Sequence, residues 1–146
     1  MIKILFVCHG NICRSTMAQS VMTHLLAQRG LSDCFTIASA ATSREEIGNP
    51  PHYGTVNKLR LVGIPVVPHR AVQMTKADYD YLIGMDSANI RNMQRILGAD
   101  NKGKIHKLLD YCGGGDVADP WYSGDFKTTY QDILRGCKAL YESLNI

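Results

Sequence analysis

The residues best suited to chemistry lie close to the N-terminus, in a segment that reads CHGNICRS. Cys8 offers a nucleophilic sulfur, and the planar guanidinium of Arg14 can bind two oxygens of a phosphoryl group at once. Gly10 permits a positive φ angle and Asn11 also tolerates it, so the segment can curl until several backbone N–H groups converge on one anion. Ser15 can donate a hydrogen bond to the sulfur. The segment therefore predicts a phosphate-binding loop that contains a cysteine nucleophile.

A strand and a helix must hold this loop. Residues Ile2 to Val7 form an apolar run of strand length, and Ser15 to Arg29 carry apolar side chains at helical spacing up to Gly30. A loop between them lies at the positive end of the helix dipole, which attracts anions. The same field lowers the pKa of a thiol below the ~8.5 of a free cysteine. We therefore expect Cys8 to be a thiolate at neutral pH.

A second motif, Asp119-Pro120-Trp121-Tyr122, can supply an acid for the leaving group. Asp-Pro in isolation is more often a turn than a catalytic site. Here proline stiffens the loop, and the two aromatic side chains can shield the carboxyl from water and stack on an aromatic substrate. We expect Asp119 to stay protonated long enough to donate a proton.

The rest of the chain alternates strands with helices, which favours an α/β fold: a parallel sheet covered on both faces, or three-layer αβα sandwich. In such sheets ligands bind beyond the carboxyl ends of the strands, where the cysteine loop lies. Further strands are expected at Cys34–Ala38, Tyr81–Met85 and Ile105–Leu109; further helices are expected at Thr55–Val62, Ser87–Leu97 (capped by Asp86 and closed by Gly98) and Lys127–Leu144.

Length and composition limit the class of protein. A chain of 146 residues, 45% of them hydrophobic, suits one core, so residues 1–146 are expected to form a single domain. The net charge of +3 is spread along the chain, so nucleic acid is not an expected partner. The N-terminal apolar run is too short and lacks the basic flank of a targeting segment, which favours a cytoplasmic protein without membrane contact. Five cysteines, an odd number, argue against a disulfide framework.

The two motifs together closely resemble the low-molecular-weight protein tyrosine phosphatases, and the resemblance covers essentially the whole chain. It implies a four-stranded parallel sheet of flavodoxin-like order. It also implies that Cys8 attacks phosphorus, that Arg14 and the loop amides bind the phosphoryl oxygens, and that Asp119 acts first as acid and then as base on water. The implied phosphate-binding loop consists of Cys8 with His9, Gly10, Asn11, Ile12, Cys13, Arg14 and Ser15.

The resemblance also indicates partners. Phosphotyrosine proteins are the expected substrates, a tyrosine kinase being one candidate, and inorganic phosphate or other oxyanions are expected inhibitors. No metal or other cofactor is expected, since Arg14 and the loop N–H groups supply positive charge. His9, His24, His52 and His106 show no metal-ligand spacing.

By the same resemblance, Asn11, Ser39 and His69 form a hydrogen-bond network that fixes the loop next to Ser15. Without the resemblance to the family, His69 would be interpreted as a surface histidine. Cys13 matches a second thiol that, in the family, forms a reversible disulfide with an oxidised Cys8. A buried thiol without a role is an equally good interpretation.

Three positions depart from the family pattern. Thr16 stands where proline is usual, which predicts a somewhat less rigid loop. Glu45 replaces an aromatic or aliphatic residue on a substrate rim that otherwise comprises Ile12, Trp121 and Tyr122. A carboxylate there should disfavour acidic residues beside the phosphotyrosine, although Glu45 and Glu46 can equally be a solvated charge pair. Val72 replaces a common arginine, and the sequence suggests no consequence.

Three other functions fit the sequence less well. Thioredoxin-coupled arsenate reductases share the fold but need a cysteine pair near the third strand, and positions 79 to 93 contain no cysteine. Phosphoarginine phosphatases of the family usually carry threonine where this chain has Ile12. A phosphotyrosine-binding or redox-sensing module without turnover is a further alternative, but the chain has both Cys8 and Asp119, and simple binding requires neither a nucleophile nor an acid.

Overall fold

The computed structural model describes residues 1–146 and contains one four-stranded parallel sheet. The strands are β1 (Ile2–Cys8), β2 (Phe35–Ala41), β3 (Tyr81–Gly84) and β4 (Ile105–Lys107), in the spatial order β2-β1-β3-β4. The chain thus winds in opposite directions on the two sides of β1, and this switch point is where parallel α/β sheets bind ligands. The flavodoxin-like strand order is confirmed.

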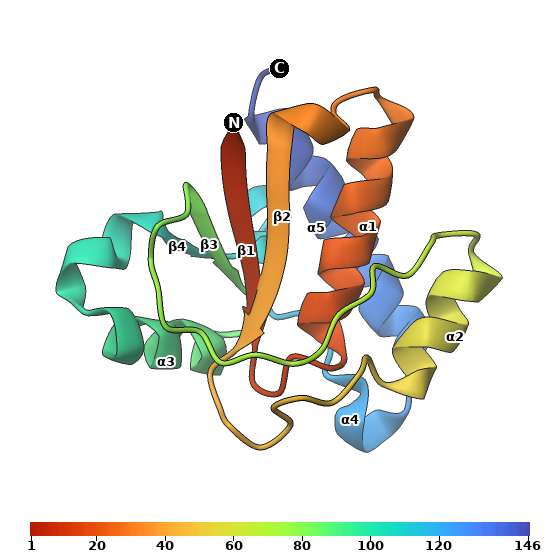
Figure 1. Ribbon diagram of the computed structural model, residues 1–146, viewed down its shortest axis with the longest axis horizontal. Coiled ribbons are helices and arrows are strands. Elements are labelled where there is room, and N and C mark those ends of the chain that lie inside the picture. The colour runs from red at the N-terminus through yellow and green to blue at the C-terminus, as the bar shows by residue number, and fades with distance from the viewer.

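Helices cover both faces of the sheet (Figure 1). The first face carries α1 (Arg14–Gln28), α2 (Tyr53–Leu61) and α5 (Phe126–Ser143), whereas α3 (Ser87–Leu97) covers the second. A short helix, α4 (Pro120–Ser123), precedes α5. No helix has both the length and the apolar character needed to cross a membrane.

Strand β1 is buried on both sides of the sheet. Its residues Ile4, Phe6 and Cys8 pack in the cluster formed with α1 and α5, while Leu5 and Val7 pack in the cluster that includes Met93 of α3. This alternation follows from the two-residue period of a strand. Because helices cover both faces, the strand needs a continuous apolar run, as the sequence shows.

Several element boundaries differ from the predicted ones. Strand β2 extends to Ala41 because Cys8 pairs with Ala41, although Ser39 to Ala41 lack the large apolar side chains that mark a strand. Strand β4 ends at Lys107, since the buried Leu108 and Leu109 lie in a 3-10 turn instead. The predicted α3 is confirmed, including its Asp86 cap and the positive φ of Gly98. Helix α4 was not predicted.

Candidate active site

The cysteine loop connects β1 to α1 and therefore lies at the carboxyl end of the central strand. Its left-handed residue is Asn11, with a φ of 59°. Of the two residues that can adopt a positive φ, only Asn11 does so, and Gly10 lies outside this region. A Cβ atom on Gly10 would lie 3.4 Å from Cγ of Glu46, which is an ordinary contact distance. The turn thus depends on the asparagine.

Two donors surround the sulfur of Cys8. The backbone N–H of Asn11 donates to Sγ at 3.3 Å, and the hydroxyl of Ser15 lies 3.0 Å from Sγ. Ser15 Oγ accepts a hydrogen bond from Asn11 Nδ2 at 2.7 Å, which leaves the hydroxyl proton free for the sulfur. Both donors therefore stabilise negative charge on Cys8.

The other end of the Asn11 amide is also held. Asn11 Oδ1 accepts hydrogen bonds from Nε2 of His69 at 2.7 Å and from the Val72 backbone N–H at 3.1 Å. Because Val72 identifies this atom as the amide oxygen, which can only accept, His69 must be the donor. The proton of the His69 ring therefore lies on Nε2. Burial lowers the pKa of His69, which favours this neutral form.

The network continues beyond His69 to a residue that the sequence interpretation missed. Nε2 of His69 lies 3.3 Å from Ser39 Oγ, which donates to Gln19 Oε1 at 2.6 Å. The structure thus brings Asn11, Ser15, Ser39 and His69 together in one network. Gln19 follows Ser15 by one helical turn on α1, and this spacing was the available signal.

Arg14 is held by two carboxylates, and the sequence interpretation placed only one of them in the site. Its side chain is only 4% exposed; Nη1 donates to Asp86 Oδ2 at 2.9 Å and to the Val117 carbonyl at 3.1 Å. Nη2 lies 3.6 Å from Asp119 Oδ2. Asp86 was predicted only as a helix cap, yet it closely follows β3, so its position at the carboxyl edge of the sheet was a usable signal.

Asp119 caps the short helix α4, where its Oδ1 accepts a hydrogen bond from the Trp121 N–H at 3.0 Å. The predicted shielding of its carboxyl group is wrong for this structure. The Asp119 side chain is 42% exposed, and Tyr122 is 90% exposed. Pro120 is the only buried residue of α4, so the helix projects its aromatic side chains from the surface.

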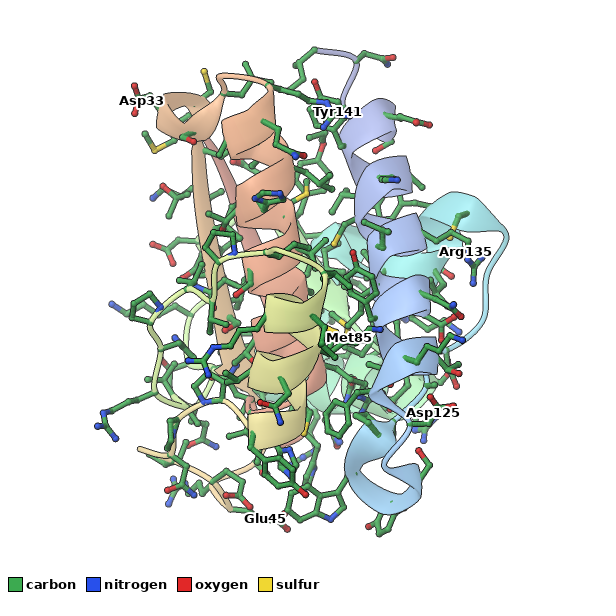
Figure 2. The ribbon with its side chains drawn as sticks, turned by 90° about the vertical axis from the view of Figure 1, so that its right-hand side faces the viewer. Asp33, Glu45, Met85, Asp125, Arg135 and Tyr141 are labelled. Carbon is green, nitrogen blue, oxygen red and sulfur yellow. The ribbon has the colours of Figure 1, made fainter.

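Cys8, Arg14 and the two carboxylates beside Arg14 line one cleft of about 370 Å³. Its mouth carries Glu45, whose Oε2 lies 2.9 Å from Nε2 of His9, with both side chains mostly exposed. Figure 2 shows Glu45 at the end of the molecule opposite Asp33 and Tyr141. The lining residues are Cys8, His9, Gly10, Ile12, Cys13, Arg14, Glu45, Glu46, Asp86, Ala88, Asn89, Asn92, Asp119, Trp121 and Tyr122.

Cys13 lies in the same lining but differs from Cys8 in its surroundings. Burial first, and then the negative charges of Cys8 and Asp119, raise the pKa of Cys13 to about 12. Its carbonyl oxygen accepts hydrogen bonds from the hydroxyls of Thr16 at 3.2 Å and Thr55 at 3.1 Å. Thr16 thus closes the first turn of α1 with its side chain. All five cysteines are unpaired.

Fold and site together define a class of protein: a parallel α/β protein with a tight loop, a cysteine and a buried arginine at the switch point of its sheet. Residues 3–146 match the family described as low molecular weight phosphotyrosine protein phosphatase. The chain belongs to this family.

Individual relatives agree with this conclusion. The low molecular weight protein-tyrosine-phosphatase YfkJ of Bacillus subtilis is 41% identical over 99% of this chain and 96% of its own length. Its crystal structure superposes with a TM-score of 0.95, covering 99% of this chain and 95% of that chain. The low molecular weight phosphotyrosine protein phosphatase of Mus musculus is 42% identical over 96% of this chain and 94% of its own length.

The fold is also shared with a protein of different name. The structure of DARP, the Drosophila arginine phosphatase, superposes with a TM-score of 0.88 and 27% identity, covering 100% of this chain and 99% of that chain. The architecture alone therefore does not separate a tyrosine from an arginine phosphatase, and the side chains of the cleft must do so.

Proposed function

We propose that this protein hydrolyses phosphotyrosine in proteins through a phosphocysteine intermediate. The observation that carries the proposal is the arrangement of Cys8, Arg14 and Asp119 along one cleft at the carboxyl end of β1. A nucleophile, a phosphate-binding cation and a proton donor are the three groups that this reaction needs.

In the first step, the sulfur of Cys8 attacks phosphorus and the bond from phosphorus to the tyrosyl oxygen breaks. The leaving oxygen takes its proton from the carboxyl group of Asp119. The guanidinium of Arg14 and the N–H groups of the loop bind the three remaining phosphoryl oxygens. The ion pair of Arg14 with Asp86 holds the guanidinium beside the loop before substrate arrives.

In the second step, water attacks the phosphocysteine and the sulfur leaves. Asp119, now a carboxylate, accepts a proton from the attacking water. The hydroxyl of Ser15 and the N–H of Asn11 stabilise the departing thiolate, because both lie within hydrogen-bonding distance of Sγ. Free enzyme and inorganic phosphate are the products.

The cleft favours a flat aromatic substrate over phosphoarginine. Ile12 presents an apolar branched side chain to the cleft, and Trp121, 52% exposed, offers a ring on which a tyrosyl group can stack. The direct test compares the kcat/KM for phosphotyrosine and phosphoarginine in otherwise identical peptides. A preference for phosphoarginine would overturn the substrate assignment and leave the cysteine chemistry intact.

The chemistry is tested with p-nitrophenyl phosphate and a phosphotyrosine peptide in the presence of a chelator. We expect the wild type to be active and Cys8→Ser to be inactive. Asp119→Ala should lose about 10²–10³-fold in kcat on the peptide. A Cys8→Ser variant that retains activity would refute the phosphocysteine route. Acid quenching of a radiolabelled reaction should trap phosphate on Cys8 of the wild type.

We also propose that Glu45 disfavours acidic residues next to the phosphotyrosine. Glu45 and Glu46 both line the cleft, and their carboxylates would repel a nearby acidic side chain. His9 partly offsets the charge of Glu45 when its ring is protonated. We expect peptides with basic flanks to have the higher kcat/KM, and Glu45→Gln to reduce the difference at low salt. Equal turnover of both peptides by the wild type would contradict the proposal.

Suitable substrates are tyrosine-phosphorylated proteins whose phosphotyrosine lies in an exposed segment, and a tyrosine kinase phosphorylated on itself is one such class. A cytoplasmic setting suits this chemistry, because a reducing compartment keeps the Cys8 thiol available. Inorganic phosphate and related oxyanions should bind the same loop and inhibit competitively.

A further inference from the structure

His52 contacts the phosphate-binding loop through its backbone and the segment that carries Asp119 through its ring. The backbone N–H of His52 donates to the Ile12 carbonyl oxygen at 2.7 Å, which ties this residue to the loop. Its ring forms a T-shaped pair with the ring of Trp121, with centroids 5.9 Å apart and planes at 73°. It also stacks on Phe126, with centroids 5.3 Å apart and planes at 21°. One side chain therefore touches both α4 and the start of α5.

Helix α4 needs such support from outside itself. It has only four residues, and Pro120 is its only buried one. A helix this short is not stable by its own hydrogen bonds. Asp119 is the cap of α4 and accepts from the Trp121 N–H, so a shift of Trp121 moves the Asp119 carboxyl group. The contact between His52 and Trp121 therefore bears on where the proton donor lies.

Phe126 provides a fixed base for this contact. Its ring packs against the cluster of Ile12, Cys13 and Ala71, the first two of which belong to the phosphate-binding loop. It also lies so close to Gly54 that a Cβ atom there would be 2.2 Å from the ring. The phenyl ring is thus confined, and the His52 ring stacked on it is confined in turn.

We infer that His52 is a positioning residue that aligns Asp119 with the leaving group by holding Trp121. This inference rests on the proposed function, in which Asp119 is the acid. Sequence patterns gave His52 no role. Nothing in its own chemistry enters the reaction, since the ring acts through its contacts with Trp121 and Phe126.

His52 also caps a helix, and substitutions can separate this structural role from the proposed positioning role. Its Nδ1 accepts a hydrogen bond from the Gly54 N–H at 3.0 Å and so caps α2. Asparagine is a good helix cap but cannot stack, so His52→Asn keeps the cap and removes the ring. Phenylalanine stacks but cannot accept, so His52→Phe keeps the ring and removes the cap.

The experiment measures how kcat/KM depends on the acidity of the leaving phenol. Phenyl phosphate releases a poor leaving group that needs an acid, whereas p-nitrophenyl phosphate releases a more acidic phenol that needs it less. We expect His52→Asn to lose about 10-fold in kcat/KM on phenyl phosphate and less than about twofold on p-nitrophenyl phosphate. His52→Phe should stay within about twofold of wild type on both substrates.

Asp119→Asn is the reference variant and should show the same pattern more strongly. Adding His52→Asn to it should cause no further change in the ratio of the two rates. Equal losses on both substrates in His52→Asn, or no loss on either, would overturn the positioning role alone. An Asp119→Asn variant without the pattern would instead remove the acid assignment of the proposed function, and the role of His52 with it.

Discussion

At the scale of single residues, Cys8 and Cys13 are two thiols of one loop with different surroundings. Donors from Ser15 and Asn11 surround the sulfur of Cys8. Cys13 is buried, and its pKa is raised to about 12. The raised pKa keeps Cys13 a thiol at neutral pH, which suits the proposed role of Cys8 as the nucleophile of the loop, because thiolate rather than thiol is the reactive form.

This contrast predicts how a disulfide between them would form after oxidation. Burial is the largest cause of the raised pKa of Cys13, so near neutral pH the thiolate fraction of Cys13 rises about tenfold per pH unit. If Cys13 attacks the sulfenic acid of Cys8, the bridging rate should rise with pH in the same proportion. To measure this rate, Cys8 is oxidised with one equivalent of peroxide and the pH is then changed rapidly. Mass spectrometry follows the disulfide between Cys8 and Cys13 over time. Cys13→Ser is the control, and a rate independent of pH would exclude Cys13 as the attacking thiolate.

His69 predicts a pH dependence of stability. Burial lowers its folded-state pKa below the ordinary 6.5, so the unfolded chain binds the proton more readily. The contribution of His69 to the free energy of unfolding is therefore complete above pH 6.5 and is lost as the pH falls toward the folded-state pKa. Urea unfolding from neutral to mildly acidic pH should show a decline that is smaller in His69→Gln.

Glutamine is a suitable replacement in His69→Gln because it does not titrate but can still donate a hydrogen bond to Asn11 Oδ1. At neutral pH the two proteins should thus differ little in kcat. An identical decline in both proteins would assign the pH dependence to other groups.

At the scale of elements, the contact between Gly54 and Phe126 predicts that a glycine-to-alanine substitution in a helix lowers the free energy of unfolding, whereas such a substitution usually raises it. Glycine to alanine inside a helix normally stabilises it by about 0.5–1 kcal/mol. In Gly54→Ala the new Cβ atom would lie 2.2 Å from the Phe126 ring, so the ring must move. Overpacking of this kind costs about 1–3 kcal/mol. We therefore expect a net loss of stability, together with lower activity, because α4 and α5 are displaced.

Gly103→Ala is the matched control. No atom lies within 4 Å of a Cβ built on Gly103, and its backbone is outside the left-handed region. Chemical denaturation should show this variant within about 0.5 kcal/mol of wild type. A Gly54→Ala variant as stable and active as the control would show that Phe126 can move without consequence.

The elements also show what the sequence could and could not predict. The strands and long helices followed from apolar periodicity, and the loop and acid motifs were located by their residue types. Asp86 and Gln19 were missed because their partners are distant along the chain or on another element, and periodicity carries no such information. Helix α4 was missed because four residues are too few to show a helical period.

At the scale of the whole molecule, anion binding should be visible as stability. Any ligand that binds only the folded state stabilises it by about 2.7 kcal/mol at a concentration of 100 Kd. For a chain of this size that raises Tm by about 5–10 °C. We expect inorganic phosphate to produce this rise in a thermal scan. Sodium chloride of equal ionic strength is the control, and an equal rise with chloride would contradict a specific phosphate site.

The parallel sheet places the cysteine loop and α4 at one end of the molecule. Both chain termini lie at the opposite end (Figure 1). A surface anchor or fusion partner attached at either terminus should therefore leave the cleft open to large substrates. The protein can be immobilised by its ends and still act on another protein's phosphotyrosine, because the polarity of four strands separates the points of attachment from the chemistry.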